Sequence, residues 1–404
     1  MRDREFQEKL LGIERPWFVD YVTMDRQSKT VETFIGYEGE ASCPECAQAA
    51  PKHDHRERRW RHLDIYEFEA FVTARVPRVD CPEHGVHQIG VPWADGRSGF
   101  TALFERLAIS LLQEMSIAAV ARTLKLTWDE IDGIMQRAIT RGLALRKERI
   151  VKHIGIDEKS FKKRHKYVTV VTDLDASEVI WVGRGRKKET LDAFWKGLSP
   201  EQLAGIEGVA MDMWPAYIES TLDFVPGASA KIVFDKFHIV KYLTHAVDLE
   251  RRAARRGDAA LKKTRYDWLR NPRNMDHSDK IAFAQLRKEH KRLGRAWAIK
   301  ECFADFWTYR YIGAARNFFK WWYGWAARSQ LRHMKAVAKL IARHFENILT
   351  YLRIRITNAG SESVNSKIQW MKYQARGFRN EGRFIRGILF HCGGLDLYPT
   401  HTTS

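Results

Sequence analysis

The sequence has no apolar run long enough to cross a membrane. A spanning helix needs roughly 20 consecutive apolar residues, and no stretch of the 404 residues approaches that length. The N-terminal stretch MRDREFQEKLLGIERPWF mixes both signs of charge and lacks the apolar centre of a signal peptide. We therefore expect a protein that has no membrane partner and stays in the cytoplasm.

Cysteine is also scarce, with five residues in the chain. Because cytoplasmic thiols are kept reduced, these cysteines favour metal ligands or free thiols over a disulfide framework. The chain shows no internal repeat and no low-complexity linker. Its length instead predicts two or three separate cores, since single domains usually hold about 100–200 residues.

Acidic residues are fewer than basic residues, and most of the difference lies in one segment of the chain. The chain has 68 Lys or Arg against 50 Asp or Glu, a net charge of +18. Residues 241–360 hold 27 of the basic and 10 of the acidic residues, a net of +17, together with six of the 14 tryptophans. This balance indicates a polyanionic partner, although a solvated helical face would have the same composition.

Two short cysteine motifs near the N-terminus predict a zinc site. CPEC supplies Cys43 and Cys46, and CPEHG supplies Cys81 and His84. Two ligands spaced by two residues on each of two turns match a closed tetrahedral site, in which Zn²⁺ is structural because no position remains for water. Four other histidines are possible substitutes for His84: His53, His55, His62 and His87.

The stretch SIAAVARTLKLTWDEIDGIMQRAITRGL predicts two helices joined by a short turn. Thr127 followed by Glu130 matches a capping box and fixes where the second helix begins. This arrangement is the helix-turn-helix, whose second helix can enter the DNA major groove, but ordinary helical hairpins share the pattern. The side chains that we expect to meet DNA are Lys125, Thr127, Trp128, Gln136 and Arg137.

Residues 150–235 contain apolar, β-branched runs separated by one helical stretch, which predicts an α/β domain. Asp157 lies in the first run, IGIDEKSF, and Asp212 ends the fourth, GVAMDMW. A carboxylate at the edge of a buried strand is costly unless it is paired or binds a cation. Two of them in neighbouring strands suggest one Mg²⁺ pocket, because this ion prefers a few carboxylates and leaves places for water and phosphate.

A third carboxylate for this pocket is not fixed by the residues alone. The candidates are Glu158, Asp173, Asp175, Asp235 and Glu362. Strand alternation points Glu158 away from the face of Asp157, and Asp173 and Asp175 lie at a turn between two strands. Asp235 and Glu362 stay open on this argument.

The order of these motifs resembles the ISL3 family of bacterial insertion-sequence transposases, which are DDE enzymes with a ribonuclease-H-like core. The resemblance covers nearly the whole chain, from the zinc motifs through IGIDEKSF, GVAMDMWPAYI and VFDKFHIVK to the closing TNAGSESVNSKIQ. It implies that Asp157, Asp212 and Glu362 are the catalytic carboxylates. Asn358-Ala359-Gly360-Ser361-Glu362 departs slightly from the family's commoner Asn-Gly-x-x-Glu form.

The resemblance also implies an activity and its partners. The three carboxylates would hold two Mg²⁺ or Mn²⁺ ions that promote DNA cleavage and strand transfer. The double-stranded DNA partners would be the element's terminal inverted repeats and a target, in a bacterial cytoplasm. Pairing two ends implies a homo-oligomer. Two alternatives are a DNA-binding regulator without the chemistry and a ribonuclease-H-like nuclease without strand transfer.

The family places a helical insertion between the second Asp and the Glu, and 149 residues intervene here. Its Arg and Lys with interleaved aromatics suit phosphate neutralisation and base stacking. Alternatively, Trp307, Trp321, Trp322 and Trp325 fill a helical core, which we expect for most of them. Lys367 is a further candidate for a DNA contact, and His238 could lie near the metals or cap the insertion.

The resulting prediction is an α+β protein of several domains. We expect a zinc-binding module at 1–95, a helix-turn-helix domain at 96–149, and an α/β ribonuclease-H-like catalytic core at 150–245 and 352–404. A mostly helical insertion at 246–351 interrupts that core. Cys302 and Cys392 are single and are expected to be structural.

Overall fold

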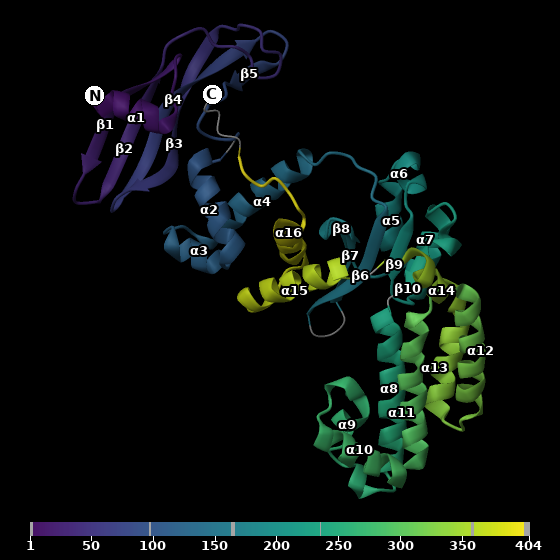
Figure 1. Cartoon of the computed structure of the whole chain (residues 1–404). Coiled ribbons are helices and arrows are strands. Elements are labelled where there is room, and N and C mark those ends of the chain that lie inside the picture. Colours follow the sequence, from purple (N-terminus) through teal and green to yellow (C-terminus); the bar gives the residue numbers. More distant parts are fainter. Residues whose placement is uncertain (1–2, 97, 163–165, 235, 357–358, 400–404) are drawn as a thin grey trace. The chain divides into compact units, whose positions relative to one another are not determined.

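The computed structural model describes residues 3–96, 98–162, 166–234, 236–356 and 359–399. The chain divides into two compact units (Figure 1). The N-terminal unit comprises Met1–Lys147, Tyr373–Arg376 and Gly394–Ser404, and the C-terminal unit comprises Glu148–Lys372 and Gly377–Gly393.

The N-terminal unit begins with a small helix and a five-stranded sheet. Their bounds are α1 Asp3–Leu11, β1 Trp17–Asp25, β2 Thr30–Tyr37, β3 Lys52–Ile65, β4 Phe68–Cys81 and β5 Gly85–Gln88. The strand order is β1-β2-β4-β3, with β5 paired to β4. Alternate residues of β4, among them Val72, Ala74 and Val76, are buried around Trp60 and Trp93. The sheet thus has one packed face, as strand periodicity requires.

Three helices follow in the same unit: α2 Ala102–Glu114, α3 Ile117–Thr123 and α4 Trp128–Ala144. Ser116 caps α3, and Thr127 with Glu130 forms the predicted capping box at the start of α4. Val120, Ile131 and Ile134 are fully buried. The two-helix pattern of the sequence is therefore confirmed at residue level.

The C-terminal unit contains a second five-stranded sheet. Its strands are β6 His153–Lys162, β7 Lys166–Asp173, β8 Glu178–Arg184, β9 Gly208–Met211 and β10 Ile232–Phe234. The order is β10-β9-β6-β7-β8: β7 pairs antiparallel with both β6 and β8, while β9 pairs parallel with β6 and β10 pairs parallel with β9. The four apolar runs that the sequence indicated all form strands.

Helices cover both faces of this sheet. One face packs with α5 Lys188–Lys196 and α7 Pro215–Phe224, through buried residues such as Ile156 and Trp195. On the other face, Val168 and Val170 pack with α15 Ala359–Gln374 and α16 Glu381–Cys392. A short helix, α6 Pro200–Ala204, precedes β9. The chain therefore leaves the sheet after β10 and returns to it at α15.

The segment between β10 and α15 is helical, as predicted. Its helices are α8 Lys236–Arg255, α9 Arg265–Leu269, α10 His277–Glu289, α11 Lys291–Phe303, α12 Ile312–Arg328, α13 Arg332–Arg343 and α14 Phe345–Ile354. Short 3-10 turns occur at Ala228–Ala230, Ala259–Leu261, Pro272–Asn274 and Ala304–Thr308. Helices α8, α11, α12 and α13 lie side by side (Figure 1). No helix within the described ranges has the length and apolar character needed to cross a membrane.

Most of the insertion's aromatic residues fill its core. Trp322 is fully buried, and Trp307 and Trp325 pack against the same cluster. Trp321 differs, because 56% of it is exposed. The expectation that most of these tryptophans pack is confirmed, with Trp321 as the exception.

Candidate functional sites

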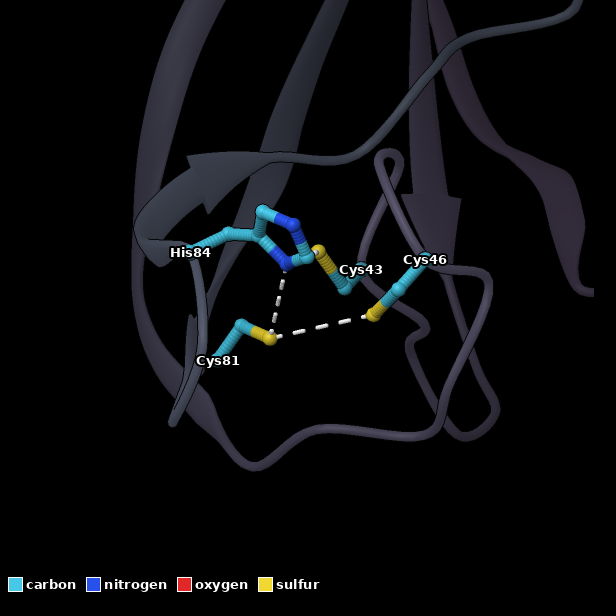
Figure 2. Close-up of side chains that lie close together, drawn as sticks. All are labelled: Cys43, Cys46, Cys81 and His84. Atoms are coloured by element: carbon cyan, nitrogen blue, oxygen red, sulfur yellow. Dashed lines mark hydrogen bonds between the residues drawn. The ribbon is translucent and has the colours of Figure 1, made fainter.

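The four predicted zinc ligands lie together at one end of the N-terminal sheet (Figure 2). Cys43 and Cys46 come from the turn after β2, Cys81 ends β4, and His84 precedes β5. Their ligand atoms all lie within 4.8 Å of one another. The turns themselves need unusual backbone: Ala47 has φ 59° and Gly85 has φ 74°.

The separations between these atoms suit a tetrahedral ion. Cys46 Sγ lies 3.8 Å from Cys81 Sγ, and His84 Nδ1 lies 3.6 Å from Cys81 Sγ and 3.9 Å from Cys43 Sγ. With Zn–S near 2.3 Å and Zn–N near 2.0 Å, tetrahedral angles give separations of about 3.8 Å for two sulfurs and about 3.6 Å for sulfur and nitrogen. The donor set and spacing therefore fit structural Zn²⁺.

Other histidines of the module have different partners. His62 Nδ1 lies 2.8 Å from the Thr101 hydroxyl, and His87 Nε2 lies 2.8 Å from the carbonyl of His84. His53 lies beside Asp54. Together with the cluster, these contacts favour His84 as the fourth ligand.

Three of the five side chains predicted to face DNA from the helix-turn-helix contact acidic residues of the protein: Lys125, Thr127 and Arg137. Lys125 pairs with Glu69 at 2.9 Å, and the Thr127 hydroxyl is used in the capping box. Arg137 turns inward to the buried Glu105, at 2.6 Å. Gln136 is exposed and Trp128 is half-buried on α4.

Asp157 and Asp212 occupy matching positions on neighbouring strands. Ile156 of β6 pairs with Met211 of the parallel β9, and each aspartate follows its member of that pair. The two side chains are 20% and 29% exposed. Equivalent positions on adjacent parallel strands place both carboxylates at one edge of the sheet.

Strand alternation also puts both carboxylates on the same face. Val170 of β7, which pairs directly with Asp157, packs with α15 and α16. Ala210, two residues before Asp212, is buried on that side with Ile356 of the segment that precedes α15. The face that carries the two aspartates is thus the one to which the chain returns after the insertion.

Helix α15 brings Glu362 to this region. Asn365 Nδ2 donates a hydrogen bond to Asp157 Oδ2 at 3.3 Å, and Glu362 lies one helical turn earlier on the same face of α15. The approach is close because Gly155 has no side chain: a Cβ there would lie 2.9 Å from the Ser361 hydroxyl. Glu362 itself is exposed.

Two further side chains contact the aspartates. The Lys159 ammonium forms an ion pair with Asp157, and His238 Nδ1 on α8 lies 2.6 Å from Asp212 Oδ1. The residues alone left the place of His238 open, and neither Lys159 nor Asn365 was among the predicted site residues. Their spacing held a signal: Lys159 shares a strand face with Asp157, and Asn365 shares a helix face with Glu362.

Two tyrosines near these carboxylates have raised pKa values. Burial raises the pKa of Tyr217, and the nearby Glu158, Asp157 and Asp212 raise it further. The pKa of Tyr242 is raised in the same way, first by burial and then by Asp212 and Glu158. Among the described residues, however, only the zinc ligands form a group of three or more Cys, His, Asp or Glu with ligand atoms within 4.8 Å. The carboxylate oxygens of Asp157, Asp212 and Glu362 therefore do not all lie within 4.8 Å of one another.

The rival carboxylates have structural partners. Glu158 points to the opposite face, as alternation requires, and pairs with Arg186 at 3.0 Å. Asp173 pairs with Arg149 at 2.8 Å and accepts hydrogen bonds from the backbone of the β7–β8 turn. Asp175 is exposed beside His153. Asp235, like Asn358 in the closing motif, lies outside the described residues.

Comparison with known proteins agrees with this organisation. A family model described as a transposase matches residues 154–388. Residues 91–139 match the helix-turn-helix domain of transposase family ISL3, and residues 39–84 match the zinc-finger of transposases IS204, IS1001, IS1096 and IS1165.

Two curated relatives span most of the chain. The transposase for insertion sequence element IS1557 of Mycobacterium tuberculosis is 30% identical over 384 residues, covering 87% of this chain and 86% of the relative. The transposase for insertion sequence element IS1001 of Bordetella parapertussis is 27% identical over 356 residues, covering 86% and 87%.

A zinc finger, a helix-turn-helix and an α/β domain with an acidic edge, in this order, define a DNA transposase that carries its own DNA-binding elements. The chain belongs to the ISL3 family of transposases.

Proposed function

We propose that this transposase binds the terminal inverted repeats of its insertion sequence and catalyses metal-dependent DNA cleavage and strand transfer. The observation that carries the proposal is the arrangement of the three acids. Asp157 and Asp212 follow the paired Ile156 and Met211, and α15 joins them through the Asn365 contact.

The proposed core is ribonuclease-H-like. Its support is the strand order β10-β9-β6-β7-β8, in which three antiparallel strands are followed by two parallel ones. The predicted limits of this core, 150–245 and 352–404, remain part of the proposal. Helix α8 continues across residues 245 and 246, so this boundary falls within a helix.

The proposed metal ligands are Asp157, Asp212 and Glu362. Their carboxylate oxygens are the hard donors that Mg²⁺ or Mn²⁺ accepts, and both aspartates are partly exposed at a sheet edge, where phosphate and water have access. Two such ions, when bound, would lower the pKa of a water and offset the charge on the scissile phosphodiester.

The side chains themselves have distinct tasks in this proposal. Asp157 and Asp212 hold position through the sheet, and Asn365 orients the Asp157 carboxylate. Lys159, already in contact with Asp157, is placed to meet a phosphate oxygen. Water hydrolyses the phosphodiester at the element end and leaves a 3′-hydroxyl and a 5′-phosphate. The 3′-hydroxyl then attacks a target phosphodiester and displaces the 3′-oxygen of the target strand, so that no side chain forms a covalent intermediate.

DNA-end recognition is assigned to the zinc module and the helix-turn-helix. The exposed Gln136 on α4 and the exposed Lys367 on α15 are proposed contacts, as is the half-buried Trp128 on α4. Lys125, Thr127 and Arg137 remain candidates, although each already has the protein partner described above. Synapsis of two ends would require a homo-oligomer.

The test is Mg²⁺-dependent cleavage of DNA that carries the natural terminal repeat. We expect Asp157→Asn, Asp212→Asn and Glu362→Gln each to abolish cleavage while leaving end binding intact. Asp175→Asn is the matched control, because this exposed carboxylate lies in the β7–β8 turn. Undiminished cleavage by Asp212→Asn would sink the catalytic assignment and favour a regulator. Cleavage without joining of a pre-cut end to a plasmid would favour a nuclease.

A further inference from the structure

The helical insertion contains a pocket that the cleavage site does not use. It lies where the beginning of α11 meets the end of α12, which run antiparallel, and its volume is about 450 Å³. The lining residues are Arg295, Trp321, Trp325, Arg328 and Ser329. Pockets for small organic groups commonly fall in the range of roughly 300–1,000 Å³. The size therefore admits one nucleotide.

The orientation of the exposed indole is fixed by its neighbour. Trp322 is fully buried and its Nε1 donates a hydrogen bond to the carbonyl of Ile299 on α11, at 2.9 Å. Because consecutive residues of a helix point about 100° apart, this anchor forces Trp321 outward. Trp321 and Trp325 lie together, with ring centroids 5.6 Å apart and planes inclined at 38°.

The pocket is also cationic. Arg295 donates a hydrogen bond to the carbonyl of Ser329 at 3.4 Å, and within the described ranges neither Arg295 nor Arg328 forms an ion pair with a carboxylate. Gly324 leaves room for Arg328: a Cβ there would lie 3.2 Å from both of its terminal nitrogens. Residues 306–345 contain eight Lys or Arg and no Asp or Glu.

We infer that this pocket binds one unpaired nucleotide of the DNA substrate. Its base stacks on Trp321 and Trp325, and its phosphate contacts Arg295 and Arg328. Indoles stack on any base because every base has a π-face, whereas a base within a duplex has both faces covered already. Guanidinium groups suit phosphate through paired hydrogen bonds. The inference rests on the proposed function for its substrate, and adds a site that holds frayed or single-stranded DNA.

The experiment compares two end DNAs, one blunt and one with a single-stranded tail, in buffer without Mg²⁺ and without chelator so that zinc is retained. We expect Trp321→Ala to weaken binding of the tailed DNA roughly tenfold, the loss typical of one stacked base. Binding of blunt DNA should change less than about twofold, and Trp321→Phe should restore most of the affinity. The double substitution Arg295→Gln/Arg328→Gln should weaken binding of the tailed DNA more than binding of the blunt DNA.

Two control variants lie in the same insertion. Tyr311→Ala removes an aromatic side chain that is 80% exposed at the opposite end of α12, and Lys339→Ala removes an exposed cation on α13. Neither should discriminate between the two DNAs. A 2-aminopurine base in the tail should be quenched by the wild type and not by Trp321→Ala. This readout reports stacking directly.

Three outcomes would overturn the inference. They are equal losses on blunt and tailed DNA, unchanged binding of tailed DNA by Trp321→Ala, and displacement of tailed DNA by micromolar free nucleotide, which would indicate a small-molecule site. Cleavage of end DNA by the wild type, assayed in parallel, tests the proposed function separately. A wild type that cleaves, with a Trp321→Ala protein that binds tailed DNA normally, refutes the pocket alone.

Discussion

Asn365 on α15 donates a hydrogen bond to Asp157 on β6, across 3.3 Å and 208 residues of sequence. The bond joins the first proposed catalytic acid to the helix that carries the third. Asn365 follows Glu362 by three residues, so holding one side chain at Asp157 also fixes the direction of the other. After the long insertion the chain thus returns to the sheet face that carries Asp157 and Asp212.

We predict that Asn365→Ala lowers end-DNA cleavage roughly tenfold or more, because hydrogen bonds to charged groups contribute about 1.5–3 kcal/mol. Binding of end DNA without Mg²⁺ should be unchanged. Gln369→Ala is the matched control, since Gln369 is exposed on the same helix. If both variants cleave like the wild type, Asn365 does not position Asp157 during the reaction.

The zinc site should hold the N-terminal module together. We expect one zinc per chain in purified protein, lost in Cys43→Ser and Cys81→Ser, because each change removes one of four clustered ligands. Structural zinc contributes on the order of 10 kcal/mol to folding of small modules, so a chelator should unfold this region. Metal analysis and protease digestion measure the two effects. Cys302→Ser, whose thiol lies in the insertion, should keep its zinc.

Glu105 should be among the most sensitive positions of the helix-turn-helix. It is 1% exposed, accepts a hydrogen bond from Ser98, and pairs with Arg137 and Arg141. Removing Glu105 takes the acceptor from Ser98 and from both guanidinium groups, at a cost of about 1–3 kcal/mol, because Arg137 is partly exposed and Arg141 keeps Asp95. Glu105→Ala should therefore lower the free energy of unfolding by that order in denaturant titrations.

Glu114→Ala serves as the control for this prediction, because Glu114 is exposed at the end of the same helix. It should change stability by less than about 0.5 kcal/mol. Similar effects of the two substitutions would contradict the role given to the buried pair.

Stability of the C-terminal unit should depend on His391 in acid. Burial, with a smaller contribution from Lys367, lowers the pKa of His391 from 6.5 to about 4. Between these pH values the unfolded chain binds more protons than the folded one. The free energy of unfolding is therefore highest above about pH 6.5 and falls as the pH drops toward 4. The full loss is roughly 3 kcal/mol.

His391→Phe should remove this part of the acid sensitivity, since a neutral ring remains beside Trp370 at every pH. The measurement is denaturant unfolding at pH 7 and pH 5 for both proteins. His245→Phe, at an exposed position on α8, should retain the wild-type dependence. Equal acid destabilisation of His391→Phe and the wild type would refute the prediction.

Much of this organisation was predictable from local patterns. CPEC and CPEHG indicated the zinc ligands because knuckle spacing is local, and Thr127 with Glu130 placed the start of α4 because a cap involves residues within one turn. The positions of the β-branched runs indicated the strands. Family resemblance, rather than spacing, singled out Glu362.

Other features cannot be predicted from the spacing of residues along the chain. Trp321 and Trp322 are adjacent and chemically identical, yet one is exposed and the other is fully buried, since only the packing of α12 on α11 selects the inward face. Arg137 looked available to phosphates until its partner, the buried Glu105 of another helix, was known.

The sequence by itself determined the ligands, caps, strands and charge distribution, because these depend on neighbours within a few residues. Only the tertiary structure decided which distant side chains meet. Strand register puts Asp157 beside Asp212, and the missing side chain of Gly155 lets α15 approach. Such contacts depend on how strands pair and helices pack across the whole unit, and no local pattern of residues encodes them one by one.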